Sequence, residues 1–208
     1  LDLAVKQLGE NVPIKVVSDI SEAIAIFDNA LPVLALDECD AMPISGTASA
    51  NTATVVIESI TRAVKLCEDG SACGVVTNPI QKSALYEAGF KHPGHTEFLA
   101  ELAGQGTVPV MMLANSKLRV VPLTIHIALS EVPKQLTSDS IIEQCEITAT
   151  ALQRDFGIAM PRLAIAGLNP HAGENGLFGE GEEEEMLDAH GMVAPKIRIN
   201  WPMNRIGL

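Results

Sequence analysis

Two histidines stand directly after segments that have the composition of β-strands. His126 follows residues 118–124 (LRVVPLT), and His171 follows residues 162–166 (RLAIA). In an open parallel sheet, ligands bind in the loops beyond the carboxyl ends of the strands. Because imidazole is a good ligand for Zn, Co, Ni and Fe, the two histidines could share a divalent metal ion. A catalytic zinc site normally has three protein ligands, so the alternative is that each is a hydrogen-bonded residue at a strand end.

Lys82 is a candidate for binding an anion. It falls in the first turn of a predicted helix, shortly after the apolar segment 73–77 (CGVVT) and the helix-opening Pro79. A cation at this end of a helix opposes the helix dipole, and an anionic ligand at the helix start would relieve the repulsion. The alternative interpretation is a solvated lysine.

The segment 92–97 (HPGHTE) predicts a second helix start with the same preference for anions. Gly94 permits a sharp turn of the backbone, and Thr96 is predicted to cap a helix that runs through Leu102. His95 would then lie at the positive end of that helix, where anions bind. The alternative is a capped helix that carries an exposed histidine.

The elements that must position these residues alternate along the chain. Strands are predicted at 13–17, 32–36, 73–77, 108–114, 118–124 and 162–166, and helices at 18–27, 51–68 and 141–156. This alternation predicts an α/β fold with a mainly parallel sheet. The run of glutamates at 182–185 is interpreted as a solvated helix face, and His190 as a surface residue.

Composition excludes several classes of protein. The 208 residues carry a net charge of −12, which argues against binding to a nucleic acid, and no apolar run is long enough to span a membrane. The four cysteines form no C-x-x-C pair, which is typical of free thiols in a cytoplasmic protein. The chain starts at Leu1 without a basic signal-peptide region, and we expect it to begin inside a longer protein.

Three segments carry a resemblance to a known family. Residues 74–102 contain the strings TNPIQK and PGHTE, residues 118–137 contain TIH, and residues 161–179 contain GLNPHAGE. Together they resemble the 4-hydroxythreonine-4-phosphate dehydrogenases of pyridoxal phosphate (vitamin B6) biosynthesis. The likeness covers residues 46–183, whereas 186–208 form a tail without the family pattern.

The resemblance implies a fold similar to isocitrate and isopropylmalate dehydrogenases, with the chain forming part of a two-lobed subunit of a homodimer. It implies NAD-dependent oxidation of 4-phosphooxy-L-threonine, with NADP as the alternative cofactor, followed by loss of CO2 to give 3-amino-2-oxopropyl phosphate. A divalent metal, either Zn, Mg or Co, would stabilise the developing negative charge on the substrate oxygen.

The resemblance also assigns roles to individual residues. His126 and His171 match metal ligands of the family, and His95 and Thr96 match a pair that contacts the substrate. Lys82 matches a family lysine and is the candidate catalytic residue near the substrate anion.

Several family segments have no match here, among them the one with the third metal histidine, which the partner subunit supplies, and those that bind NAD. We therefore expect the cofactor-binding residues to lie outside this sequence. Two alternatives stay open: a dehydrogenase of a related 4-phosphorylated threonate or erythronate, and an inactive fragment that binds a ligand.

Overall fold

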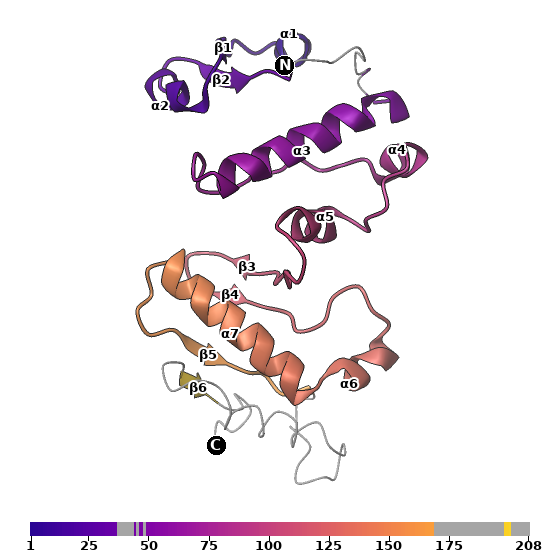
Figure 1. Ribbon diagram of the computed structural model, residues 1–208, viewed down its shortest axis with the longest axis vertical. Coiled ribbons are helices and arrows are strands. Elements are labelled where there is room, and N and C mark those ends of the chain that lie inside the picture. Colours follow the sequence, from indigo (N-terminus) through magenta and orange to yellow (C-terminus); the bar gives the residue numbers. More distant parts are fainter. Residues whose placement is uncertain (37–43, 45, 48, 169–197, 201–208) are drawn as a thin grey trace. The chain divides into compact units, whose positions relative to one another are not determined.

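The structure is a computed structural model that describes residues 1–36, 44, 46–47, 49–168 and 198–200. It divides into two compact units, residues 1–109 and 110–208, and each unit is described by itself. Figure 1 labels their elements along the chain. The tail at 186–208 lies outside the described residues except for 198–200, and so do His171 and His190.

After the short helix α1 (Asp2–Leu8), the first unit contains a parallel pair of strands, β1 (Ile14–Val17) and β2 (Leu31–Leu34). Strand β1 pairs with β2, with Ile14 opposite Leu31 and Val17 opposite Leu34, close to the strands predicted at 13–17 and 32–36. Asp19 caps the intervening helical segment, accepting from the Ser21 amide, while Glu22 accepts from the amide of Asp19. This reciprocal pattern is a capping box, which satisfies amides that a helix start leaves free. The elements are α1 (Asp2–Leu8), β1 (Ile14–Val17), η1 (Ile20–Glu22), α2 (Ala23–Ile26) and β2 (Leu31–Leu34).

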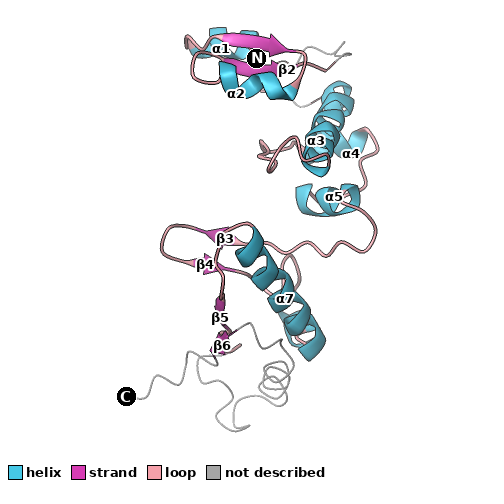
Figure 2. Ribbon diagram, turned by 60° about the vertical axis from the view of Figure 1, so that its left-hand side comes forward, coloured by secondary structure: helices cyan, strands magenta, loops and turns pink. Residues whose placement is uncertain are grey.

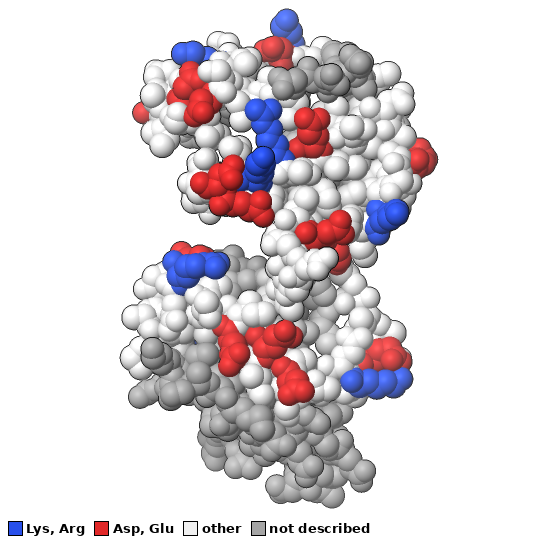
Figure 3. Space-filling view, in the orientation of Figure 1, with Lys and Arg blue, Asp and Glu red and all other residues white. Residues whose placement is uncertain are grey.

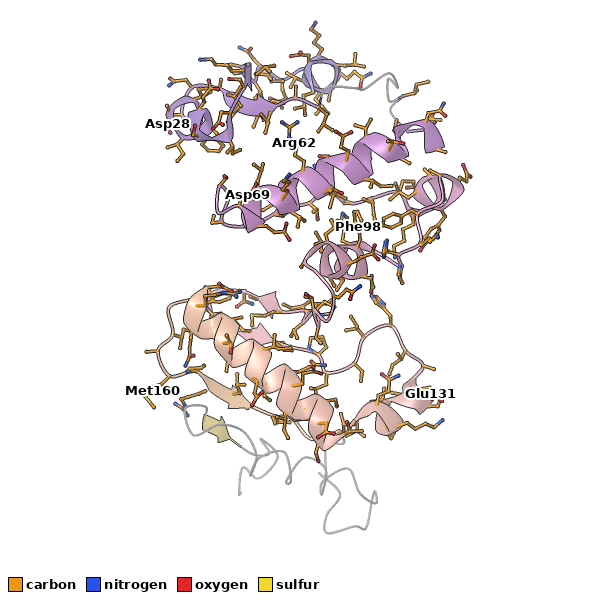
Figure 4. All side chains as sticks on the ribbon, viewed as in Figure 1. Asp28, Arg62, Asp69, Phe98, Glu131 and Met160 are labelled. Carbon is orange, nitrogen blue, oxygen red and sulfur yellow. The ribbon has the colours of Figure 1, made fainter. Side chains whose placement is uncertain are left out.

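The long amphipathic helix predicted at 51–68 is confirmed. It consists of a short turn, η2 (Ala50–Thr52), and α3 (Ala53–Glu68). It ends where the sequence predicts, with Gly70 in the left-handed conformation at φ 74°. Arg62 points from α3 toward the strand pair (Figure 4), and its guanidinium donates to the Ala35 carbonyl over 2.9 Å, just beyond β2.

Two short helices complete the first unit, α4 (Lys82–Glu87) and α5 (His95–Leu102). The strand predicted at 73–77 is wrong, because this segment is irregular and Val76 is 100% exposed. An extended segment becomes a strand only when a neighbour pairs with its backbone, and among the described residues no partner strand lies beside it. Pro79 is also not a helix-opening residue, since α4 begins at Lys82.

The second unit is built around one long helix. Its elements are β3 (Leu113–Ala114), β4 (Arg119–Val120), η3 (Leu129–Glu131), α6 (Val132–Gln135), α7 (Ser138–Arg154), β5 (Arg162–Ala164) and β6 (Arg198–Asn200). β3 and β4 form an antiparallel hairpin at a turn where the Asn115 carboxamide accepts from the amides of Lys117 and Leu118. β5 and β6 are parallel. The strands predicted at 108–114 and 118–124 are thus much shorter than expected, because only their facing ends pair.

Helix α7 presents a buried face and an acidic face. Two of its residues, Ile141 and Cys145, pack with Leu136 and Ile165 in what we call the α7 core cluster. The opposite face carries acidic residues, and Figure 3 shows them in red over α7. Arg119 of the hairpin stacks 4.9 Å from the ring centre of Phe156, just beyond α7, and Figure 2 shows the hairpin beside the helix. The helix predicted at 141–156 is therefore confirmed, with Gly157 at φ 67° beyond its end.

The observed architecture agrees with the predicted class at a coarse level. The described residues form a mixed helix and strand structure in which two of the three strand pairs are parallel. Among these residues, no helix combines the length and the apolar character needed to cross a membrane.

Candidate functional site

The Lys82 ammonium lies close to the turn that begins helix α5. A Cβ atom placed on Gly94, the residue before the helix, would lie 3.6 Å from Nζ of Lys82 and 3.5 Å from Oε2 of Glu97. Lys82 makes no ion pair with the described carboxylates. Its charge is therefore available to an external anion at the start of α5.

The start of α5 differs from the prediction. Gly94, not Thr96, is the N-cap residue, and no side chain caps the helix. Thr96 is instead the second residue of the helix, because the helix start lies two residues earlier, with Gly94 as the N-cap. The first backbone amides of a helix have no partners within it, so an uncapped start binds anions well.

His95, the first residue of α5, has a buried polar atom that needs a partner. Its Nε2 is buried and makes no hydrogen bond with the described residues. Leaving such an atom unsatisfied costs about 1–3 kcal/mol. A ligand that offers a hydrogen-bonding group to this nitrogen would recover part of that cost. The predicted grouping of Lys82 and His95 is thus supported by their positions at one helix start.

Sequence reasoning missed the aromatic cluster that holds this turn. The His92 ring packs 5.0 Å from Phe90 and 5.1 Å from Phe98, measured between ring centres. Nε2 of His92 also lies 3.5 Å from the Glu101 carboxylate. Phe98 is buried on α5 (Figure 4), so the cluster fixes the segment just before Gly94 to the helix. The aromatic residues on both sides of the HPGHTE string were the available signal.

In the second unit, His126 is exposed and adopts an unusual backbone conformation. Its φ of 57° makes it the one non-glycine residue with positive φ in the described part of the chain. Such a left-handed conformation costs roughly 1–2 kcal/mol and is common at functional sites. An exposed imidazole at a fixed backbone position suits a metal ligand, and its nitrogen donors match Zn or Co.

The segments that lead to the two candidate metal ligands pack on the same cluster. Leu123, three residues before His126, packs against the α7 core cluster. Leu163 packs there too, and Ile165, six residues before His171, belongs to the cluster. Both segments therefore contact the same cluster, although β4 and β5 belong to different strand pairs and not to one parallel sheet. His171 itself lies outside the described residues.

The described residues alone do not form a complete metal centre. No group of three or more His, Cys, Asp and Glu residues among them could hold a metal ion. What they provide is an uncapped helix start beside Lys82 in the first unit and an exposed histidine in the second.

These features define a mixed α/β protein with a candidate site for an anionic ligand and a candidate metal ligand. The chain belongs to the family described as pyridoxal phosphate biosynthetic protein PdxA, whose model matches residues 2–196. That match is longer than the region 46–183 over which we noted the resemblance.

Relatives and solved structures agree with this family. The chain is 51% identical over 182 residues to 4-hydroxythreonine-4-phosphate dehydrogenase from Bradyrhizobium diazoefficiens, covering 86% of this chain and 52% of that protein. It is 46% identical to the enzyme of that name from Erythrobacter litoralis, covering 89% and 55%. The crystal structure of the Klebsiella pneumoniae enzyme matches with a TM-score of 0.82 at 32% identity, covering 92% of this chain and 59% of that one. The chain thus spans little more than half the length of these relatives.

Proposed function

We propose that the polypeptide containing this chain is a 4-hydroxythreonine-4-phosphate dehydrogenase that acts in pyridoxal phosphate biosynthesis. It would oxidise 4-phosphooxy-L-threonine with NAD and release CO2 to give 3-amino-2-oxopropyl phosphate. The relatives of that name at 46–51% identity support the reaction. The observation that carries it is the uncapped start of α5, where the Lys82 ammonium and the unpartnered Nε2 of His95 lie.

In this proposal, the start of α5 binds the substrate. Lys82 attracts the negatively charged substrate, and His95 offers a hydrogen-bonding nitrogen that has no described partner in the protein. Thr96, in the first turn of the helix, contributes a hydroxyl group. Charge-assisted hydrogen bonds of this kind are stronger than neutral ones, so they can hold a phosphorylated substrate in an acidic protein.

We propose that His126 and His171 bind a divalent metal, either Zn, Mg or Co, together with a third histidine from the partner subunit of a homodimer. When bound, the metal supplies positive charge that stabilises the developing alkoxide and enolate oxygens. The exposed imidazole of His126 and the shared packing of the two segments on the α7 core cluster support this assignment.

The remaining parts of the proposal concern the longer protein. We infer that residues elsewhere in it bind NAD, with NADP as the alternative cofactor. The chain would contribute to a two-lobed subunit similar to isocitrate and isopropylmalate dehydrogenases, in which 46–183 carry the substrate and metal residues. The family match reaches residue 196, so the tail expected at 186–208 belongs to the family in part. We infer a cytoplasmic enzyme, for which free thiols are typical, and one that acts on a small substrate without binding nucleic acid or membranes.

The test is NADH formation by the intact polypeptide. We expect NADH from 4-phosphooxy-L-threonine and NAD only when a divalent metal is present, and its loss in His126→Ala and in His171→Ala. His95→Ala should raise KM or lower kcat with little change in NAD affinity. Full activity in either metal-ligand variant would contradict the metal assignment.

Two other outcomes would support the alternatives. NADH formed only from 4-phosphorylated threonate or erythronate would indicate a related dehydrogenase, because these substrates differ at the 2-substituent. Measurable binding of a phosphorylated ligand without NADH formation under any metal would indicate an inactive binding protein.

A further inference from the structure

Gln144 connects helix α7 to the segment that carries His126. Its side-chain Nε2 donates to the carbonyl oxygen of Leu123 over 2.8 Å, and the bond is partly buried. The two residues are 21 positions apart in the sequence, so this is a tertiary contact and not a local turn. Leu123 lies beyond β4, which ends at Val120, and its carbonyl is therefore not part of the β3–β4 ladder.

The side chain of Leu123 is fixed to the same helix. It packs against the α7 core cluster, to which Ile141 and Cys145 contribute from the turns around Gln144. Ile141 is fully buried, at 0% exposure. Both the backbone and the side chain of Leu123 are therefore held by one face of α7, the backbone through a single hydrogen bond.

Leu123, which α7 holds in this way, lies three residues before His126, whose backbone is in the left-handed conformation. A left-handed conformation in a non-glycine residue persists only when the surrounding structure fixes it. In the described structure, no strand ladder extends past Val120 toward His126. The fixed position of Leu123 therefore constrains the backbone shortly before His126.

We propose that Gln144 is a positioning residue for His126. It holds the Leu123 carbonyl so that the imidazole is presented to a divalent metal, and it does not itself contact the metal or the substrate. The inference rests on the proposed metal-binding role of His126. Residues that orient metal ligands from behind typically change metal affinity about 10- to 100-fold when they are replaced.

Helix α7 offers a matched control in Gln153. This residue also donates its Nε2 to a backbone carbonyl, that of Ala159, over 3.2 Å. That bond anchors the exposed loop after α7, which leads toward β5 and away from Leu123 in sequence. Replacing each glutamine by methionine removes the donor and keeps a similar side-chain length.

The experiment measures Co2+ affinity of the intact polypeptide, without substrate, by the visible absorption of the bound ion. We expect Gln144→Met to weaken Co2+ binding about tenfold, and Gln153→Met to change it less than about twofold. Hydrogen exchange of the amides of Val121 and of residues 123–126 should become faster in Gln144→Met only. Unchanged Co2+ affinity in Gln144→Met, or an equal loss in both variants, would overturn the proposal.

Two further variants keep the result interpretable. Gln144→Lys retains a donor of similar reach, so it should preserve most of the Co2+ affinity even if Gln144→Met fails to fold. A full loss of Co2+ affinity in folded Gln144→Lys would contradict the proposal.

His126→Ala tests the metal-binding role of His126 separately from the positioning role of Gln144. If it leaves Co2+ binding intact, the metal-binding role of His126 fails and this inference fails with it. If it abolishes Co2+ binding while Gln144→Met does not weaken it, only the role of Gln144 fails.

Discussion

The ammonium of Lys82, at the first residue of α4, lies beside Gly94, the N-cap residue of α5. A Cβ atom on Gly94 would contact Nζ of Lys82 at 3.6 Å and Cε at 3.8 Å. The positive charge of Lys82 and the uncapped start of α5 therefore lie side by side in the first unit. Both features attract anions, and neither is used by a described carboxylate in an ion pair.

Removal of the Lys82 charge should weaken binding of phosphorylated ligands. For Lys82→Ala we expect the affinity for the phosphorylated substrate to fall about tenfold or more, because a charge-assisted contact contributes roughly 1.5–3 kcal/mol. NAD affinity should change much less. Calorimetric titration with each ligand measures both effects.

Lys91 provides the matched control for this charge. It is exposed, like Lys82, and has the same side chain, but the atoms nearest to a Cβ on Gly94 belong to Lys82 and Glu97 and not to Lys91. Lys91→Ala should leave substrate affinity within about twofold, since solvent and salt screen a charge that does not lie beside the bound anion. Equal weakening of substrate and NAD binding in Lys82→Ala would point to a structural role for Lys82.

A methyl group on Gly94 should obstruct the anion site without unfolding the protein. The backbone of Gly94 is extended, at φ −174°, and the added Cβ would make ordinary contacts of 3.5–3.8 Å with Glu97 and Lys82. We expect Gly94→Ala to cost about 1 kcal/mol or less in stability. Phosphate affinity should fall about fivefold, because the methyl would occupy space next to the ammonium. Gly74→Ala, where a Cβ meets nothing within 4 Å, is the control. An undiminished phosphate affinity in Gly94→Ala would place the anion elsewhere.

The cysteines should differ in reactivity toward an alkylating reagent. Cys145 is 8% exposed in the α7 core cluster, and burial, assisted by the nearby charge of Glu146, raises the pKa of its thiol. Since the thiolate is the reactive form, Cys145 should be labelled only after denaturation, whereas the exposed Cys73 should react in the native state. Mass spectrometry of labelled peptides tests this order, and native labelling of Cys145 would show that α7 packs differently.

The capping box at the start of η1 should weaken in acid. Hydrogen bonds from Ser21 lower the pKa of Asp19, and hydrogen bonds from Ser18 and the Asp19 amide lower the pKa of Glu22. The folded state favours the ionised form of both carboxyl groups. Their contribution to the stability of this segment is therefore fully present above their ordinary pKa values and is lost as the pH falls through the lowered pKa values. Hydrogen exchange at the amides of Ser18, Asp19 and Ser21 should therefore show loss of protection at acid pH, after correction for intrinsic rates. The double variant Asp19→Asn, Glu22→Gln should lose this pH dependence. A wild-type protection that is independent of pH would contradict the assigned hydrogen bonds.

Some elements could be predicted because their signals lie within a few neighbouring residues. Helices α3 and α7 were predicted from the spacing of their apolar residues and from the glycines that follow them, Gly70 and Gly157. These signals depend on residues within about one helical turn.

The start of α5 shows how two local signals can compete. Thr96 is the better capping residue by type, yet the chain turns at Gly94, where the aromatic packing of His92 on Phe98 holds the segment.

The predicted strands at 73–77, 108–114 and 118–124 failed for a different reason. Apolar composition makes a segment suitable for a sheet, but a strand also needs a hydrogen-bonding partner from elsewhere in the chain. Partners are a property of the assembled structure, and in the described residues only the ends of the last two segments find them.

The sequence by itself determined the local elements and the identity of the candidate residues, because helix periodicity, caps and motif strings are short-range properties. It singled out Lys82, His95, Thr96, His126 and His171 and carried the resemblance to the family that matches residues 2–196. Only the tertiary structure decided that Lys82 reaches Gly94, that Nε2 of His95 is buried without a described partner, and that Gln144 holds the segment before His126. These contacts join residues that are separated in the chain, and packing and burial in three dimensions determine them.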